Sequence, residues 1–175
     1  MKPDQGNGDK LKIRVSGLSA GSHEYSFTVS PPDILLGDNF HPPVSVDVRL
    51  EKTARQIVIR TKISATGEFP CDRCLNVFNQ DIAAGYAMVY AFDEQDAAAY
   101  PPEEVRIVPH DVSVIDLAAD VREMILLSVP LKLVCREECR GLCSSCGSDL
   151  NTTTCHCRRE TTNLTWQGLE KLLKH

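Results

Sequence analysis

The chain has 175 residues, of which 42% are hydrophobic and 25% are charged. This length allows one sizeable core and a small satellite module, and the composition is ordinary for a globular protein. The net charge of −5 is unevenly distributed, since residues 1–131 carry 12 basic and 19 acidic side chains whereas residues 132–175 carry 7 and 5. An acidic body argues against a free-standing nucleic-acid binder, which needs concentrated Lys and Arg. Any RNA contact is therefore local, weak or made through a protein partner.

Neither a secretory signal nor a membrane span is predicted. Residues 1–10 are polar, lack an apolar h-region and form a flexible N-terminus. The longest apolar segment, residues 124–134, is interrupted by Ser128, Pro130 and Lys132 and falls short of the roughly 18 residues that a span requires. We therefore expect a soluble, cytoplasmic protein in a reducing compartment, with no membrane partner.

The first two thirds of the chain carry a strand pattern. Apolar and polar residues alternate in residues 11–15, 25–29, 44–50 and 56–66. The stretch from Pro31 to Pro43 is rich in turn residues, and residues 93–102 form an acidic loop or a short helical excursion. Strands joined by short turns predict an antiparallel sheet with one face covered.

A helix over residues 113–128 is expected to provide the cover. Ile115, Val121 and Ile125 belong to a wide apolar stripe at helical spacing. Ser113 has the side chain of an N-cap, and Asp116 follows three residues later. A second, short amphipathic helix is predicted over residues 164–173.

These patterns predict an α+β fold in two parts. Residues 11–131 form an antiparallel β-sheet domain covered by a helix. Residues 132–175 form a small, cysteine-rich zinc-knuckle module with the C-terminal helix.

The cysteines carry the strongest chemical signal. There are eight, namely Cys71, Cys74, Cys135, Cys139, Cys143, Cys146, Cys155 and Cys157. Two residues between paired cysteines let a tight turn direct both sulfurs at one metal ion, and four thiolates complete a structural zinc site. In a reducing compartment clustered cysteines bind metal or act in catalysis more often than they form disulfides. We therefore predict one or two structural zinc ions.

The first knuckle, Cys71-Asp-Arg-Cys74, lies between two strand-like segments. A knuckle at a hairpin tip supplies only two ligands, so it must share a second pair. Thiol-disulfide enzymes also use this spacing, but they place the pair at a helix N-terminus, where the thiol pKa falls. The strand pattern on both sides of the first knuckle disfavours that reading.

The preferred assignment makes two sites of four. The first knuckle joins Cys135 and Cys139, and the remaining four cysteines form the second site. An alternative assignment gives residues 135, 139, 143 and 146 a shared ion. His156 stands between two ligand candidates and is interpreted as a spectator. Closed four-thiolate sites leave no open position for water, so no metal catalysis is expected.

Three stretches of the chain resemble the YceD family, described as large ribosomal RNA subunit accumulation proteins. They are Pro70-Cys-Asp-Arg-Cys74-Leu75 with Phe78; Ile115-Asp-Leu117, Glu123–Leu127 and Val129-Pro-Leu131; and Cys139-Arg-Gly-Leu-Cys143, Cys146-Gly147, Asp149-Leu-Asn151 and Cys155-His-Cys157. The resemblance implies an α+β protein that supports ribosome assembly, with ribosomal RNA or a large-subunit ribosomal protein as partner.

The leading hypothesis is a non-enzymatic ribosome-assembly factor. Four arginines near the cysteines would supply any RNA contacts: Arg136, Arg140, Arg158 and Arg159. The alternative is a zinc-knuckle interaction module that binds a basic ribosomal or transcription protein. An enzyme is the weakest reading, because the sequence has no phosphate loop, nucleophile elbow or zinc-protease motif and implies no small-molecule substrate. Among enzymes, a thiol oxidoreductase is disfavoured by the strand pattern around the first knuckle.

Overall fold

The computed structural model describes residues 10–157, and their contacts divide the chain into two compact units. The sheet unit contains the described residues up to Phe69 together with Asn79–Leu131, and the cysteine-rich unit contains Pro70–Phe78 and the described residues from Lys132 onward. The sequence pattern assigns Pro70–Phe78 to the β-rich domain. These residues instead group with the cysteine-rich segment, because the loop that carries the first knuckle hydrogen-bonds to residues 133–142.

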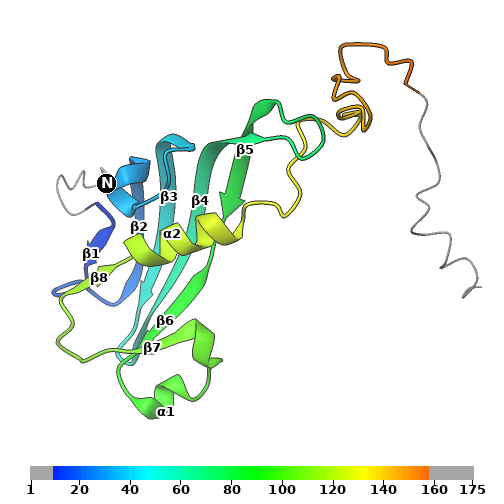
Figure 1. Cartoon of the computed structure of the whole chain (residues 1–175). Coiled ribbons are helices and arrows are strands. Elements are labelled where there is room, and N and C mark those ends of the chain that lie inside the picture. Colours follow the sequence, from blue (N-terminus) through cyan, green and yellow to red (C-terminus); the bar gives the residue numbers. More distant parts are fainter. Residues whose placement is uncertain (1–9, 158–175) are drawn as a thin grey trace, which may run out of the picture. The chain divides into compact units, whose positions relative to one another are not determined.

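The structure forms eight strands and four short or medium helices within the described residues (Figure 1). In chain order they are β1 (Lys12–Arg14), β2 (Gly21–Val29), η1 (Pro31–Ile34), β3 (Phe40–Lys52), β4 (Gln56–Pro70), β5 (Val77–Ala84), β6 (Ala87–Ala91), α1 (Glu94–Ala97), η2 (Pro102–Glu104), β7 (Val105–Ile107), β8 (Val114–Asp116) and α2 (Ala118–Leu127).

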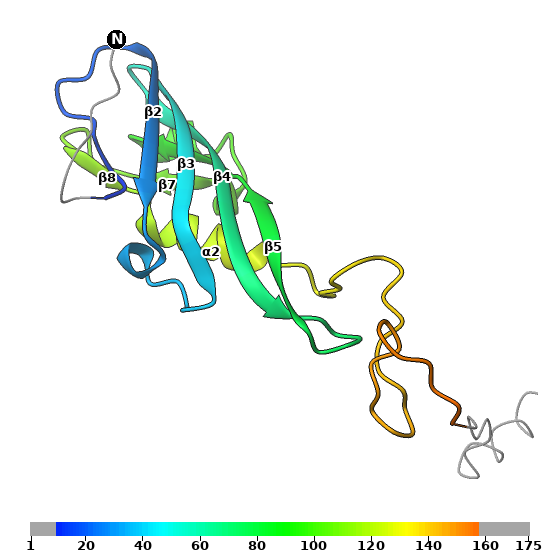
Figure 2. The same cartoon turned by 90° about the horizontal axis from the view of Figure 1, so that it is seen from above.

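Most of the strands form one sheet, in the order β2-β3-β4-β6-β7, and β5 also pairs with β4. Figure 2 shows the long strands β2, β3 and β4 side by side. The pairs β2–β3, β3–β4 and β4–β6 are antiparallel, whereas β6 and β7 are parallel. β1 and β8 form a separate antiparallel pair. The predicted antiparallel sheet is therefore mixed at one edge.

Alternation along the strands builds the core of the sheet unit. In β3, Val44, Val46, Val48 and Leu50 are buried while the residues between them are exposed. The period-2 pattern places these side chains on one face, where burial of apolar surface stabilises the sheet. Leu117, Val121 and Ile125 belong to the same hydrophobic cluster as the strand residues.

The predicted helix over residues 113–128 begins too early. The structure starts α2 at Ala118 with Leu117 as N-cap, and Val114–Asp116 is β8. Ile115 pairs with Ile13 of β1, so the backbone of this stretch is committed to strand hydrogen bonds. Ser113 does not cap the helix, because it precedes β8 and Leu117 is the N-cap; its carbonyl accepts from the N–H groups of Val15 and Ser16.

Other local expectations have mixed outcomes. The acidic stretch forms the short helix α1, with Asp93 Oδ1 accepting from the Asp96 N–H. Pro42 and Pro43, expected in a turn, lie inside β3 where the β3–β4 register shifts between His41 and Ser45, an irregularity that tolerates proline's missing N–H.

Residues 1–9 and the helix expected over residues 164–173 lie outside the described residues. From residue 10 to residue 157, the helices lack the length and hydropathy needed to cross a bilayer.

Candidate metal centre

The first knuckle occupies the loop between β4 and β5. β4 ends at Pro70 and β5 begins at Val77. The Cys71 N–H donates to the Asn76 carbonyl at 2.9 Å, and the Leu75 N–H donates to the Cys71 carbonyl at 2.9 Å. Leu75 has a left-handed backbone with a φ of 61°, and among the described non-glycine residues only Leu35 also has a positive φ. These bonds close a tight turn that brings both cysteine sulfurs together, as the sequence predicts for a hairpin tip.

Asp72 and Arg73, the two residues between the paired cysteines, hold the second pair in place. The Asp72 N–H donates to the Leu133 carbonyl, and the Asp72 carboxylate accepts from the Leu133 N–H, both at 2.7 Å. Arg73 Nη1 donates to the carbonyls of Glu137 and Cys139 at 3.0 and 2.9 Å. The knuckle therefore binds the backbone on either side of Cys135.

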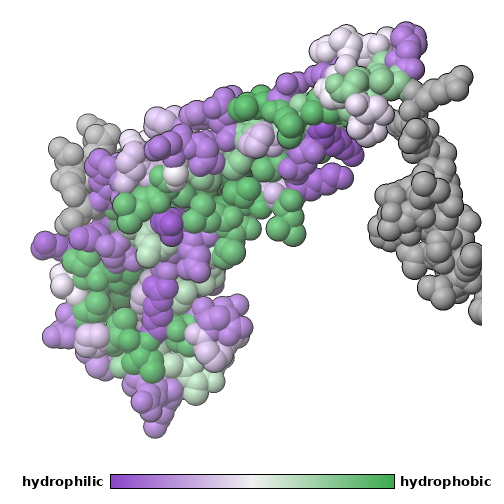
Figure 3. All heavy atoms as spheres, in the orientation of Figure 1, coloured by the Kyte–Doolittle hydropathy of each residue, from purple (hydrophilic) through white to green (hydrophobic). Residues whose placement is uncertain are grey.

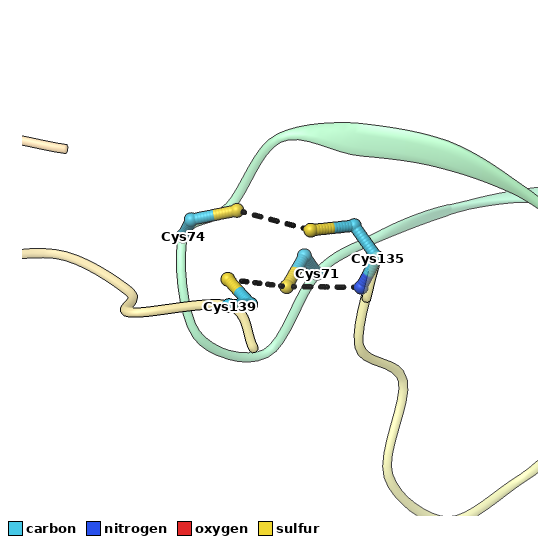
Figure 4. Close-up of side chains that lie close together, drawn as sticks. All are labelled: Cys71, Cys74, Cys135 and Cys139. Atoms are coloured by element: carbon cyan, nitrogen blue, oxygen red, sulfur yellow. Dashed lines mark hydrogen bonds between the residues drawn. The ribbon is translucent and has the colours of Figure 1, made fainter. Parts of the chain in front are cut away.

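The first quartet, Cys71, Cys74, Cys135 and Cys139, has the dimensions of a tetrahedral thiolate site. Figure 4 shows the four sulfurs directed toward one another. The Sγ atoms of Cys71 and Cys139 are 3.8 Å apart, as are those of Cys74 and Cys135, and all four lie within 4.8 Å of one another. Tetrahedral bonds of about 2.3 Å to one ion would separate sulfurs by about 3.8 Å. The first quartet therefore fits a metal ion such as zinc.

Hydrogen bonds to sulfur favour the thiolate form at Cys71. Burial opposes ionisation of the Cys71 thiol, but backbone N–H donors, including those of Cys135 at 3.4 Å and Arg73 at 3.5 Å, lower its pKa to about 6. Burial and the neighbouring Cys139 sulfur raise the pKa of Cys135 to about 12. Four thiolates this close repel one another, so full ionisation requires a cation among them.

The second quartet, Cys143, Cys146, Cys155 and Cys157, is more exposed. Cys155 Sγ lies 3.3 Å from Cys143 Sγ and 3.5 Å from Cys146 Sγ. The Gly147 N–H donates to the Cys143 carbonyl at 2.8 Å, and Gly147 has a φ of +72°, the positive value expected of a knuckle glycine. The hydroxyl and backbone N–H of Ser148 lower the pKa of Cys146 to about 6.

The structure gathers the eight cysteines in the two quartets of the preferred assignment. All eight lie within the described residues, and all are free thiols. Each quartet could hold a metal ion. The alternative grouping of residues 135, 139, 143 and 146 does not occur. Cys135 and Cys139 lie with the first knuckle, whereas Cys143 and Cys146 lie with Cys155 and Cys157. His156 belongs to neither quartet.

Two of the four arginines expected to contact RNA lie beside the first quartet. Arg136 and Arg140 line a hollow of about 300 Å³ together with Glu138 and Asn151. Both arginines are exposed. Arg158 and Arg159 lie outside the described residues.

Sequence reasoning missed the polar residues that connect the sulfurs. Asn151 donates to Cys139 Sγ at 3.5 Å and to Asp149 Oδ1 at 2.7 Å, and Asn76 donates to Asp149 Oδ2 at 3.0 Å. Position inside a cysteine pair could have pointed to Asp72 and Arg73. No comparable signal marks Asn76, which is distant in sequence from its partner.

The family model for YceD, the large ribosomal RNA subunit accumulation protein, matches residues 59–173, more than half of the chain. A Mycobacterium tuberculosis protein described as uncharacterized is 26% identical over 132 residues, covering 74% of this chain and 62% of the relative. A Mycobacterium leprae protein, likewise described as uncharacterized, is 25% identical over 109 residues, covering 62% and 49%. The chain thus spans about half to three fifths of the mycobacterial relatives it matches.

A plant relative has a name that refers to ribosomal RNA. The Arabidopsis thaliana protein is called large ribosomal RNA subunit accumulation protein YCED homolog 1, chloroplastic. It is 32% identical over 68 residues, covering 39% of this chain and 19% of the relative. No solved structure matches the chain.

Gly141 and Gly147 provide a matched pair of variants. Both have a positive φ, +73° and +72°, so Ala costs about 1–2 kcal/mol of backbone strain at either position. A Cβ at Gly141 would also lie 2.8 Å from the Arg73 carbonyl oxygen, which accepts from the Leu142 N–H, whereas a Cβ at Gly147 meets nothing within 4 Å. We expect Gly141→Ala to accelerate Leu142 amide exchange at least about tenfold more than Gly147→Ala. Equal acceleration in the two variants would contradict the close approach of Gly141 to the first knuckle.

Proposed function

Because the chain belongs to the YceD family, we propose that it is a non-enzymatic, zinc-binding factor that supports accumulation of large-subunit ribosomal RNA and ribosome assembly in the cytoplasm. The observation that carries the proposal is the pair of four-sulfur quartets in a chain whose family description names large ribosomal RNA subunit accumulation. The family description names ribosomal RNA accumulation, and the role in ribosome assembly is proposed from it. The role of the metal comes from the sulfur geometry.

Zinc is the metal that best suits these quartets. Thiolate is a soft ligand, and a tetrahedral set of four selects zinc or an iron–sulfur centre. The 3.8 Å sulfur separations in the first quartet correspond to a single central ion. Four protein ligands fill the coordination shell and leave no position for water or substrate, which supports a structural role and a non-enzymatic protein.

The cysteine-rich unit is the part proposed to contact ribosomal RNA. Arg136 and Arg140 are exposed and line one hollow, so their guanidinium groups are available to phosphate oxygens. Glu138 lines the same hollow and limits its positive charge. A few arginines on a small unit support local contacts that depend on salt concentration. Arg158 and Arg159 are proposed to extend this surface.

Metal analysis tests the zinc assignment. The full chain purified without chelator should contain about two zinc ions. Stripping the zinc should abolish amide protection in residues 71–78 and 133–157, because structural zinc supplies folding free energy to small units. Buried strand residues such as Val46 and Ile59 should stay protected and serve as the internal control. Protein without zinc, or a stripped cysteine-rich unit that keeps its protection, would refute the assignment.

Genetic complementation tests the arginines. A strain lacking the protein should lose mature large-subunit ribosomal RNA, and the wild-type gene should restore it. A variant with Ala at Arg136, Arg140, Arg158 and Arg159 should restore only part of the mature large-subunit ribosomal RNA, since each lost phosphate contact weakens RNA binding. A matched variant with Ala at Arg49, Arg55, Arg60 and Arg14, exposed arginines of the sheet unit, should restore it fully. Equal restoration by both variants would remove the proposed role of the first set.

A second candidate function is protein binding through the sheet unit. η1 and α2 line an apolar groove of about 940 Å³. Leu35 and Leu127 in this groove are 79% and 71% exposed, and Leu126 is 41% exposed. Figure 3 shows apolar residues gathered over the α2 region, with polar residues around them. Exposed apolar patches bordered by polar groups are typical of interaction sites.

Charge suggests what this groove would bind. Asp33, Asp116 and Glu123 line it together with the basic residue Arg122, and Asp33 forms an ion pair with Lys10 at 3.0 Å. Arg122 Nε donates to the Leu35 carbonyl at 2.9 Å and fixes η1 against α2. An apolar floor with an acidic rim complements a peptide segment that combines apolar side chains with Lys or Arg, as basic ribosomal proteins provide.

Binding measurements with purified basic large-subunit ribosomal proteins test the groove. The double variant Leu35→Ser, Leu127→Ser should bind at least about tenfold more weakly than wild type, because both exposed leucines lose their apolar contact. Ile107→Ser, which changes an exposed apolar residue outside the groove, is the control. The groove has no such role if the double variant binds as the control does or if none of these proteins binds the wild-type chain.

A further inference from the structure

Asn151 connects the two cysteine quartets. In sequence it lies between Cys146 and Cys155, two members of the second quartet. Its side-chain amide nevertheless donates to Cys139 Sγ of the first quartet at 3.5 Å. A residue in the loop of one quartet thus makes a hydrogen bond to a sulfur of the other.

The amide orientation is fixed by its other partners. Asn151 Oδ1 accepts from the Arg140 N–H at 2.9 Å, and Nδ2 donates to Asp149 Oδ1 at 2.7 Å. A backbone N–H can only donate and a carboxylate can only accept, so only one orientation satisfies both contacts. The NH₂ group therefore faces Cys139, where it stabilises the thiolate form.

Asp149 provides a second connection. Its Oδ2 accepts from Asn76 Nδ2 at 3.0 Å, and Asn76 is the residue whose carbonyl closes the turn of the first knuckle. The backbone carbonyl of Asp149 accepts from the N–H and the hydroxyl of Thr153, two residues before Cys155, at 2.9 and 2.8 Å. The same aspartate therefore contacts the loop of each quartet.

The backbone between the quartets is shared as well. The Leu142 N–H donates to the Arg73 carbonyl, and the Leu150 N–H donates to the Gly141 carbonyl, both at 2.9 Å. Leu142 also forms a bridge with Asp149. The residues between Cys139 and Cys143 therefore bond to the first knuckle on one side and to the loop of the second quartet on the other.

We propose that Asn151, with Asp149, couples the two quartets, so that Zn²⁺ in one site raises the affinity of the other for Zn²⁺. The inference rests on the proposed zinc binding and adds a positioning role for residues that are not ligands. Ligands at positions 146 and 155 hold the loop that carries Asn151, and the ordered amide then supports Cys139. Hydrogen bonds to ligating atoms change metal affinity by about 10–100-fold. Linkage makes the effect reciprocal, so both sites gain by the same factor.

A double-mutant cycle on the full chain measures this coupling. Zn²⁺ is withdrawn with a competing chelator, and NMR signals of the Cys74 and Cys155 amides report the occupancy of each quartet separately. Disabling the second quartet with Cys146→Ser and Cys157→Ser should lower the Zn²⁺ affinity of the first by a factor within the range of about 5–150 usual for coupled sites. In an Asn151→Ala background the same two cysteine substitutions should lower the Zn²⁺ affinity of the first quartet by about threefold or less, because the connection is already lost.

Two further variants separate coupling from a general structural role. Asn151→Asp keeps the shape and the acceptor for the Arg140 N–H but removes both donors, so it should weaken Zn²⁺ binding by the first quartet about 10–100-fold. Asn79→Ala, an exposed change on β5 in the sheet unit, should bind Zn²⁺ as wild type does. Retained protection of the Val46 and Ile59 amides shows that the sheet unit of each variant is folded, and protection of the hydrogen-bonded Leu142 amide in the zinc-loaded protein shows the same for the cysteine-rich unit.

The outcomes distinguish coupling from zinc binding itself. Wild-type protein that takes up no Zn²⁺ would overturn both proposals. If the protein binds two zinc ions but the affinity of the first quartet is the same whether or not the second quartet is disabled, the coupling is overturned and the zinc assignment stands. Wild-type affinity in the Asn151→Asp variant would likewise overturn the role of the amide donors.

Discussion

The structure of the cysteine-rich unit is constrained by the mutual repulsion of four closely spaced thiolates, which must be offset for the unit to form. The first quartet joins residues 61 and 68 positions apart, the separations of Cys74 from Cys135 and of Cys71 from Cys139. Around these sulfurs the unit buries only a small cluster, with Phe78, Val134 and Leu142 packed against it. So little apolar surface seldom stabilises a fold of this size, and a central cation would both relieve the repulsion and supply the missing free energy.

The sheet unit has a different basis for its stability. Its core contains aliphatic side chains from β3, β4 and α2 that are almost fully buried, and among the described residues both candidate metal groups lie in the cysteine-rich unit. The chain leaves the sheet unit at the end of β4 and returns in β5, so the first knuckle lies at the tip of the hairpin that these two strands form. A sheet that folds by apolar burial therefore fixes the ends of the loop that supplies half of the first site.

The sequence predicts features that depend on local pattern. Alternation identifies β3 and β4, and the two-residue spacing of Cys71 and Cys74 between strand-like segments places the first knuckle at a hairpin tip. The start of α2 is missed because Ile115 fits a helical stripe equally well, and only its pairing with Ile13 makes it part of a strand. Asn151 is missed for a similar reason, since its contact with Cys139 arises from the tertiary fold. The sequence predicts two sites of four cysteines but gives no sign that Asp149 contacts the loops of both.

The central claim is that each quartet holds one zinc ion through four sulfur atoms. X-ray absorption at the zinc edge, combined with the metal content of the full chain, tests it most directly. The account predicts two zinc ions per chain, each surrounded by four sulfurs at about 2.3 Å with no lighter ligand. A shell that includes nitrogen or oxygen, or a single zinc ion per chain, would contradict it.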